Sequence, residues 1–325
     1  MSRVLAIETS CDETSVAIID DGCRIVLNDI ASQIDFHREF GGVVPEIASR
    51  QHTEIISQMT QRALSTAGDR VDAIAVTAGP GLMGSLLVGV CFAKAFAYAR
   101  ELPLVPVHHI EGHLFSPFLQ GVPPEFPALA LVVSGGHTQL VHCRAAHEYE
   151  LLGATRDDAV GESFDKVARL LGLPYPGGPS IQRAAESGNP RAYAFPRGMV
   201  HSDNLDFSYS GLKTAVLYTL RENPNANLAD IAASFQAAAI DILVSKTQSA
   251  LERTGAPRLL VVGGVAANRL LRDRLAAEIR VPVLAPPIAL CTDNAAMIGA
   301  AGYSRLAHGF AGNMRLTPNP SLFLV

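Results

Sequence analysis

Residues 4–20 read VLAIETSCDETSVAIID, and residues 128–143 read ALALVVSGGHTQLVHC. Each stretch has an apolar run, a short turn of small and polar residues, and a second apolar run. Continuous apolar runs of this length are typical of buried strands. Two such hairpins, about 125 residues apart, predict a duplicated architecture. The expected strands are Val4–Ile7, Ser15–Ile19, Ala128–Val133 and Gln139–Cys143.

Each hairpin is followed later in the chain by a strand, a glycine-rich turn and a helix. The first of these units has the strand Ala73–Thr77, a turn over 78–81 and a helix from about 84 to 100. The second has the strand Leu259–Val262, a turn over 263–268 and a helix to about 279. Glycines let the backbone approach a phosphate closely, and the N-terminus of a helix favours negative charge. These turns predict the binding of an anion.

The glycine-rich turns match neither of two common nucleotide motifs. The chain has no GxxxxGK[ST] sequence of a P-loop, and no GxGxxG opens the first helix as in a Rossmann fold. In the ASKHA class, which includes actin, Hsp70 and sugar kinases, hairpins of two duplicated lobes hold the phosphates of a nucleotide. We therefore expect an α/β protein with two duplicated lobes around a nucleotide-binding cleft. The alternative is that the glycines only allow the chain to turn and bind no ligand.

The lobes and the remaining elements follow from the same patterns. We expect the first lobe at 1–125 and the second at 126–293, with a C-terminal helix of about 294–325 packed back on the first lobe. Helical spacing of apolar residues predicts further helices at Pro45–Leu64, Ser163–Leu171 and Asn227–Arg253. Loops are expected at 28–44, 116–127, 172–212 and 282–292.

Composition restricts the class of protein. Of 325 residues, 48% are hydrophobic and 18% charged, which indicates a globular protein with a large core and excludes a disordered chain. The net charge of −5 argues against a general polyanion binder, so a nucleic acid must meet a local basic face or one supplied by a partner. Five cysteines without a CxxC pair argue against a disulfide framework and structural zinc, and favour a reducing compartment.

Residues 73–93 form a run of 21 positions without a charged side chain. Gly79-Pro80-Gly81 interrupts this run, so a buried strand, a turn and a buried helix explain it better than a membrane span. The N-terminus has no long apolar run before a cleavage site and no Arg-rich amphipathic presequence. We expect a soluble, cytoplasmic protein that does not bind a membrane.

The densest group of potential ligands is His108-His109-Ile110-Glu111-Gly112-His113. On a helix, His109 and His113 share one face and can bind one metal ion. In the zincin motif HExxH the glutamate directly follows the first histidine. Ile110 occupies that place here, so a zincin peptidase is poorly supported. A solvated or capping pair of histidines is the alternative to a metal site.

Asp293 is the candidate for a third ligand. It lies in Thr292-Asp293-Asn294, between an apolar run and a small-residue helix. It is either an acidic residue at a helix N-terminus with no other role or an oxygen ligand. Two histidines and one carboxylate with open positions suit Fe(II) or Zn(II) and leave room for a substrate oxygen.

Motifs spread from residue 7 to residue 299 together resemble one family. The chain is similar to the universal tRNA-threonylcarbamoyladenosine transferases, the TsaD/Gcp family, and its opening IETSCDET resembles the bacterial branch. The motifs, in order, are IETSCDETSVAI, HREFGGVVPEIASRQH, AGPGLMGSLLVG, HHIEGH, SGGHTQL, GESFDKVARLLGLPYPGGP, FSYSGLKTA, GGVAANRLLR and CTDNAAMIG.

The resemblance implies an ASKHA fold and a transferase. Its reaction moves the threonylcarbamoyl group from threonylcarbamoyl-AMP to N6 of adenosine 37 in tRNAs reading ANN codons. His109, His113 and Asp293 would hold one Fe(2+) per subunit, with Zn(2+) possible; no acid or base is implied. The residues implied to bind the adenylate are Val132, Val133, Ser134, Gly135, Gly136, Asp165, Gly178 and Asn268. The residues implied on the phosphate side are Glu8, Thr9, Ser10 and Asp12.

Each implied residue has a plainer interpretation. Asp165 and Lys166 fit the solvated face of a helix, Gly178 fits a turn, and Asn268 fits a helix cap. An excess of arginine over residues 253–280 is a candidate surface for RNA.

Three other functions compete with the transferase. An ASKHA kinase of small molecules would share the phosphate turns but would not need the metal ligands. A metal-dependent glycoprotein peptidase would require a glutamate directly after the first histidine, and this chain has Ile110 there. A non-catalytic paralogue would lack HxxxH. The resemblance further implies tRNA as substrate, a TsaB-like paralogue and a TsaE-like ATPase as partners, and a TsaC-type synthase that supplies the adenylate.

Overall fold

The computed structural model describes residues 2–119 and 121–325 and divides them into two compact units. The first unit takes in the described residues up to Glu125 together with Pro286–Val325, and the second is Phe126–Ala285. The predicted lobes differ from these units at residues 286–293, and their status as domains stays a prediction.

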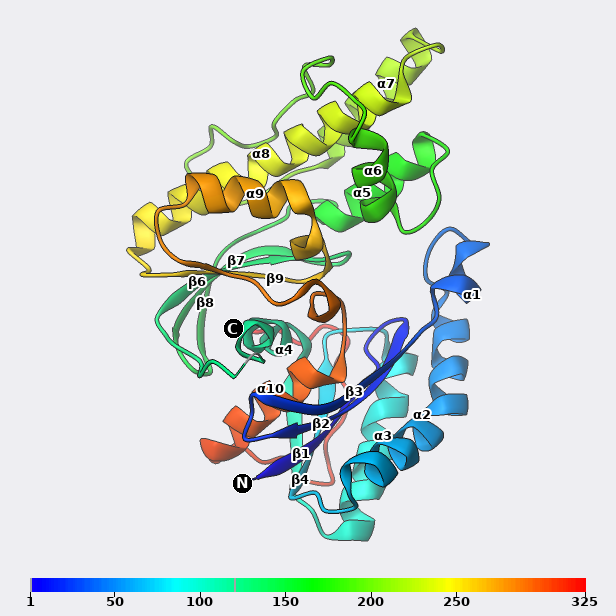
Figure 1. Cartoon of the computed structure of the whole chain (residues 1–325), viewed down its shortest axis with the longest axis vertical. Coiled ribbons are helices and arrows are strands. Elements are labelled where there is room, and N and C mark those ends of the chain that lie inside the picture. Colours follow the sequence, from blue (N-terminus) through cyan, green and yellow to red (C-terminus); the bar gives the residue numbers. More distant parts are fainter. Residues whose placement is uncertain (1, 120) are drawn as a thin grey trace. The chain divides into compact units, whose positions relative to one another are not determined.

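The first unit is built on a five-stranded mixed sheet (Figure 1). In the order β3-β2-β1-β4-β5, the first three strands are antiparallel, and β1, β4 and β5 run parallel. The bounds of the strands are β1 Arg3–Glu8, β2 Glu13–Asp20, β3 Arg24–Ser32, β4 Ala73–Gly79 and β5 Leu104–His108.

Helices cover both faces of this sheet. The helices α2 (Pro45–Ala67) and α3 (Met83–Arg100) lie side by side (Figure 1) and share a core with Leu5 and Ile7 of β1. Alternate residues of a strand point to opposite faces, and Ala6 accordingly contacts α10 (Ala295–Ala307). The remaining helices of the unit are α1 Ile34–Arg38, α4 His109–Phe115, η1 Ser116–Phe118 and η3 Ile288–Leu290.

Small residues let α10 approach the sheet closely. A Cβ atom on Gly299 would lie 2.6 Å from a side-chain carbon of Ile19, and one on Gly302 would lie 2.5 Å from Ala75 Cβ. Glycine is therefore required at both positions for this packing. The contact fixes the segment that leads into α10, which carries Asp293.

The second unit repeats the topology of the first. Its strand order is β10-β9-β6-β7-β8, with β6, β7 and β8 antiparallel and β6, β9 and β10 parallel. The repetition confirms the duplicated architecture that the two hairpin sequences predicted. The strands are β6 Ala128–Val133, β7 Thr138–Ala145, β8 Glu148–Ala154, β9 Leu259–Val262 and β10 Val283–Leu284.

The long helix α8 (Leu228–Thr254) packs on β6 and β7 and is the central helix of the second unit. It also contacts three shorter helices, α6, α7 and α9. The remaining helices are α5 Val160–Leu170, α6 Gly177–Ala185, α7 Ser210–Glu222, η2 Gly264–Ala267 and α9 Arg269–Glu278.

All four expected loops are partly wrong: 116–127 contains η1, 282–292 contains β10 and η3, and the loops at 28–44 and 172–212 contain longer elements. The loop at 28–44 contains the end of β3 and all of α1, and the loop at 172–212 contains α6 and the start of α7. The strand β3 has alternating half-buried and exposed residues and lies at the edge of its sheet, so it lacks the apolar run by which a central strand is recognised.

Two helices of the described residues, α3 and α8, are long and apolar enough to cross a membrane. The core helix of a soluble protein passes the same test. Two thirds of the apolar window of α8 is buried inside the second unit, whereas α3 is one third buried and packs on α2 and β4. Both helices thus have protein contacts that account for the apolar residues in their sequences.

Candidate functional site

Three potential metal ligands lie together in the first unit. His109 and His113 are one turn apart on α4, and Asp293 directly precedes the N-cap residue of α10. The Oδ1 atom of Asp293 lies 3.1 Å from His113 Nε2 and 3.5 Å from His109 Nε2. One ligand atom from each side chain lies within 4.8 Å of the other two. The structure brings together the three residues that the sequence predicted as ligands.

His108 fixes the first turn of α4. Its Nδ1 accepts a hydrogen bond from Ile110 N over 3.1 Å, so His108 is the N-cap. Its Nε2 then carries the proton and donates to Leu322 O over 3.1 Å. Burial lowers the pKa of His108 to about 4, so the ring is neutral at pH 7. His108 therefore anchors the helix and is not a fourth ligand.

Asn294, not Asp293, caps α10. Its Oδ1 accepts a hydrogen bond from Met297 N over 3.1 Å, and its side-chain amide donates to backbone carbonyls of the preceding turn. Ser15 Oγ accepts a further hydrogen bond from the first amide of the helix. Asp293 directly precedes this cap and its carboxylate faces the two histidines, so the interpretation of an acid at the helix N-terminus with no other role is not supported.

Glu111 points away from the ligands and holds α4 to α10. It is 1% exposed, and its Oε2 accepts a hydrogen bond from Arg305 Nη1 over 2.9 Å. Gly112 lies where the two helices meet, because a Cβ atom there would be 2.7 Å from Ile298 Cδ1. Glu111 is thus a structural ion-pair partner, which contradicts a zincin-type role as general base.

His109 lies between two carboxylates. Its Nδ1 is 3.2 Å from Glu8 Oε2, and its Nε2 faces Asp293. Burial alone lowers the pKa of His109, but the charges of Asp293 and Glu8 outweigh it and raise the pKa to about 9. Burial raises the pKa of Glu8, and the charge and hydrogen bond of His109 reverse this and lower it. A metal ion that binds Nε2 must therefore displace a proton near pH 7.

The cluster fits a divalent metal ion. Two imidazoles and a carboxylate are donors that Fe(II) and Zn(II) accept. Donor atoms about 2.0–2.2 Å from a common metal lie about 3–3.6 Å from one another. Asp293 Oδ1 meets this with both Nε2 atoms, at 3.1 and 3.5 Å, and the histidine ligand atoms lie within 4.8 Å of each other. His113 is fully buried. Its Nδ1 has no hydrogen-bond partner among residues 2–119 and 121–325, so Nε2 is the atom that its surroundings engage.

The turn after β1 keeps most of its side chains inside the first unit. Thr9 Oγ1 donates to a backbone carbonyl of α3 over 2.9 Å, and Ser10 Oγ lies 3.2 Å from His109 Nδ1. Glu8 is fully buried, and Asp12 is 8% exposed. Two carboxylates repel a phosphate unless a cation lies nearby. The phosphate-side role of these four residues stays a prediction that depends on a bound cation.

The turn between β4 and α3 binds the C-terminal segment of the chain. Asn319 N donates to Ala78 O over 2.8 Å, and Gly81 N donates to Pro320 O over 3.2 Å. A Cβ atom on Gly79 would lie 2.0 Å from Asn319 O, so only glycine allows this approach. The prediction of an anion site is wrong for this turn, because the segment already occupies it.

The turn between β6 and β7 is tight, and its glycines are open. Ser134 N donates to His137 O over 2.8 Å, and His137 N donates to Ser134 Oγ over 3.1 Å. A Cβ atom on Gly135 or Gly136 would meet no atom of the described residues within 4 Å, chain neighbours aside. A Cβ on Gly161, in contrast, would lie 2.6 Å from Ser134 O. Packing requires glycine at 161 only, and the other two leave room for a ligand.

A third open glycine, Gly178, lies in the turn that Asp165 supports. The Oδ1 atom of Asp165 accepts a hydrogen bond from Gly177 N over 2.7 Å and so fixes the turn before α6. A Cβ on Gly177 would lie 2.5 Å from Asp165 Cα, whereas one on Gly178 would meet nothing within 4 Å among the described residues. Lys166 pairs with Asp158 over 2.6 Å. Asp165 is therefore a support for the Gly178 turn, and Lys166 belongs to a solvated face.

Asn268, Val132 and Val133 have structural roles of their own. The Oδ1 atom of Asn268 accepts a hydrogen bond from Leu271 N over 3.1 Å, which confirms the helix-cap interpretation. Its Nδ2 donates to Gln236 Oε1 over 2.9 Å. Val132 and Val133 are fully buried in β6, so only their backbone is available to a ligand. Their roles toward an adenylate stay predictions.

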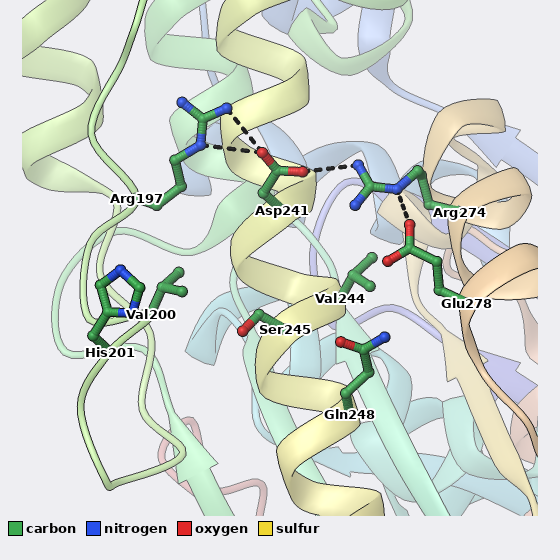
Figure 2. Close-up of a pocket in the computed structure, with 9 residues that line it drawn as sticks. All are labelled: Arg197, Val200, His201, Asp241, Val244, Ser245, Gln248, Arg274 and Glu278. Carbon is green, nitrogen blue, oxygen red and sulfur yellow. Dashed lines mark hydrogen bonds and ion pairs between the residues drawn. The ribbon is translucent and has the colours of Figure 1, made fainter.

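The predicted arginine-rich surface at 253–280 is partly neutralised. Figure 2 shows Arg197 and Arg274 on opposite sides of Asp241, which lies on α8. Each arginine has a guanidinium nitrogen 2.8 Å from a carboxylate oxygen of Asp241, and Arg274 also pairs with Glu278. These side chains line a pocket of about 320 Å³. Because its charges cancel, this pocket offers a phosphate backbone little net attraction.

Two contacts of the site were not predicted from the sequence. One is the hydrogen bond between Glu8 and His109, and the other is the ion pair between Glu111 and Arg305. Both join residues far apart in the chain. A signal was available for Glu8, because a carboxylate at the end of an apolar strand is costly to bury without a partner.

Comparison with known families gives a consistent match. A family model described as "TsaD: tRNA N6-adenosine threonylcarbamoyltransferase" matches residues 24–300. A tRNA N6-adenosine threonylcarbamoyltransferase of Desulfitobacterium hafniense (strain Y51) is 54% identical over 314 residues, covering 93% of this chain and 92% of its own. The corresponding protein of Halalkalibacterium halodurans is 53% identical and covers 99% and 96%.

Solved structures of low sequence identity share the fold. Full-length HypF matches with a TM-score of 0.64 and 13% identity, over 94% of this chain and 46% of the HypF chain. Component A of (R)-2-hydroxyglutaryl-CoA dehydratase from Acidaminococcus fermentans matches with a TM-score of 0.57 and 13% identity, over 94% and 100%. These likenesses confirm the predicted ASKHA fold class.

Proposed function

Because the chain belongs to the tRNA N6-adenosine threonylcarbamoyltransferase family, we propose that it forms threonylcarbamoyladenosine in tRNA with the help of a metal ion. The substrates are threonylcarbamoyl-AMP and N6 of adenosine 37 in tRNAs that read ANN codons, and AMP is released. The observation that supports the metal-assisted reaction is the cluster of His109, His113 and Asp293. We propose one Fe(2+) per chain, with Zn(2+) as the alternative.

The reaction is an acyl transfer from a mixed carbamoyl–phosphate anhydride to an amine. A bond forms between N6 and the carbamoyl carbon, the bond from that carbon to the phosphate oxygen breaks, and AMP leaves with the bonding electrons. N6 loses one proton to solvent. AMP is a good leaving group, so the reaction requires no nucleophilic side chain. The protein has to orient the amine and stabilise developing negative charge.

The chain's own residues divide these tasks in the proposal. His109, His113 and Asp293 hold a metal ion, which when bound supplies Lewis-acid stabilisation of oxygen charge. The adenylate binds at the β6–β7 turn and at Gly178. The open sides of Gly135, Gly136 and Gly178 support this assignment, because packing explains none of these glycines.

The partners follow the family resemblance. We propose that the enzyme acts in the cytoplasm on the anticodon loop, a single-stranded target of the kind that RNA-binding proteins usually recognise. A TsaB-like paralogue and a TsaE-like ATPase assemble with it, and a TsaC-type synthase supplies the adenylate. The lobes 1–125 with 294–325, and 126–293, are the proposed domains.

Single-turnover transfer of labelled threonylcarbamoyl-AMP to an ANN-decoding tRNA, with the partners present, tests the proposal. His109→Ala should lower the rate about 100-fold or more, because one metal ligand is lost. His308→Ala, which changes an exposed histidine of the same unit, is the matched control and should transfer normally. Equal transfer by both variants would contradict the metal assignment. No transfer by the unaltered protein, with partners and metal verified, would contradict the reaction and favour a kinase.

A further inference from the structure

The carboxylate of Glu8 lies at the end of β1, behind the predicted ligand His109. Its side chain is fully buried. The Oε2 atom lies 3.2 Å from His109 Nδ1 and accepts a hydrogen bond from Thr77 Oγ1 over 2.6 Å. The Oε1 atom accepts a hydrogen bond from the backbone N–H of Ser10. Both oxygens therefore have partners within the first unit.

This arrangement decides which nitrogen of His109 carries the proton. An ionised carboxylate only accepts hydrogen bonds, so the hydrogen between Glu8 and His109 belongs to Nδ1. In the neutral, metal-binding form the imidazole has one N–H, and Nε2 therefore keeps its lone pair. That is the atom which lies 3.5 Å from Asp293 Oδ1, on the side of the metal ligands.

His113 offers a contrast on the same helix. Its Nε2 lies 3.1 Å from Asp293 Oδ1, as a ligand atom should. Its Nδ1 is buried and has no partner in the described part of the chain. The nitrogen of His113 that points away from the ligands therefore has no side chain among the described residues to hold it, whereas Glu8 holds the corresponding nitrogen of His109.

We propose that Glu8 is a positioning residue for the metal ion. It fixes the ring orientation of His109 and keeps a proton on Nδ1, so that Nε2 is the nitrogen that faces the ion. The inference rests on the proposed function in one respect, that His109, His113 and Asp293 bind a metal. Carboxylates that orient metal-binding histidines typically contribute about 10–100-fold to affinity.

Glu8→Gln tests the tautomer directly, because the two side chains have nearly the same shape. The single oxygen of glutamine has to accept from Ser10 N–H, so its NH2 group points at Thr77 and His109. The hydroxyl of Thr77 can rotate and accept, but His109 Nδ1 must now accept as well. The proton moves to Nε2, and the lone pair turns away from the ligands.

The measurement is the dissociation constant for Zn(2+) and Co(2+), by competition with a chromophoric chelator and without tRNA. We expect Glu8→Gln to weaken binding about 10–100-fold. Asp20→Asn is the matched control: it makes the same change at a carboxylate of the same sheet that is 1% exposed and pairs with Arg3. It should lower the melting temperature and leave metal affinity unchanged.

The outcomes separate this inference from the proposed function. No binding by the unaltered protein would contradict the metal site itself, and with it the inference. Normal binding by the unaltered protein and equal binding by Glu8→Gln would contradict the inference alone. If Glu8→Gln does not fold, nitrogen NMR of the unaltered, metal-free protein at alkaline pH, where the ring is neutral, gives the tautomer. A proton on His109 Nδ1 supports the inference, and a proton on Nε2 overturns it.

Discussion

The turn after β1 and the turn after β6 occupy the same place in two sheets of identical topology, yet their chemistry differs. The first turn, residues 8–13, carries three carboxylates, and its Glu8 lies against a histidine of α4. The second turn, residues 134–137, is held by Ser134 and exposes two glycines at which an added Cβ atom would meet nothing within 4 Å among the described residues, chain neighbours aside. One turn is closed by protein contacts, and the other is open.

The difference shows how a duplicated fold comes to bind two kinds of partner. Buried carboxylates and imidazoles attract a cation, and they need donors such as Thr77 to remain charged inside the protein. Open glycines attract nothing by charge, but they let a neutral backbone approach a large ligand closely. The topology alone therefore does not specify the ligand, and the residues at the two turns do.

The two turns should respond differently to pH, and this is the largest difference that we predict between them. The pKa of His109 is raised to about 9, so below that pH a metal ion has to displace a proton. Affinity for Zn(2+) should therefore rise about tenfold per pH unit between pH 7 and 9. Chelator competition, corrected for protonation of the chelator, measures this. AMP binding at the uncharged second turn is the control, and its affinity should not change between pH 7 and 9. Zn(2+) affinity that does not change over this range would contradict the raised pKa of His109.

Substituting glycines of the second turn sharpens the comparison. Gly136→Val adds its side chain to open space, so the melting temperature should hardly change while affinity for AMP falls about tenfold, or about 1.4 kcal/mol. Gly161→Val adds a Cβ atom 2.6 Å from Ser134 O and should cost about 1–3 kcal/mol of folding free energy. Calorimetric titration and thermal unfolding separate the two effects. Unchanged AMP affinity in Gly136→Val would contradict an adenylate site at this turn.

Much of the fold could be predicted from local sequence. The central strands β1 and β6 are continuous apolar runs, and His109 and His113 recur at helical spacing, so one stretch of chain contains each signal. Asp293 could be proposed as an oxygen ligand because the histidine pair needs a third ligand, although its place beside a helix start also fitted an acid with no other role. The structure adds that Asn294 is the cap, which leaves Asp293 to the histidines.

The remaining features depend on contacts between distant segments. The edge strand β3 has no continuous apolar face, so only its pairing with β2 identifies it. The contact between Glu8 and His109 joins residues 101 positions apart, and no periodicity reports such a pair. The turn at Gly79 looked like an anion site because its glycines are visible in the sequence, but the segment that occupies it lies some 240 residues later.

Removal of Thr317–Val325 should affect the first turn and its metal site without affecting the second. The deleted segment donates to Ala78 O through Asn319 N, and it supplies carbonyls to Gly81 N and His108 Nε2. Three hydrogen bonds at about 0.5–1.5 kcal/mol each suggest a loss of about 1–3 kcal/mol, since water replaces some of them. Zn(2+) affinity should fall severalfold, because His108 loses the contact that anchors the first turn of α4.

A shorter deletion provides the matched control. Removal of Phe323–Val325 takes away the side chains of Phe323 and Val325, which are 84% and 69% exposed, and leaves the three hydrogen bonds in place. Thermal unfolding and chelator competition should therefore give unchanged values for this variant. AMP affinity should be unchanged in both deletions, because the open turn after β6 has no part in these hydrogen bonds. Unchanged stability and metal affinity in the longer deletion would show that α4 is positioned without the C-terminal segment, through Glu111 and Arg305 alone.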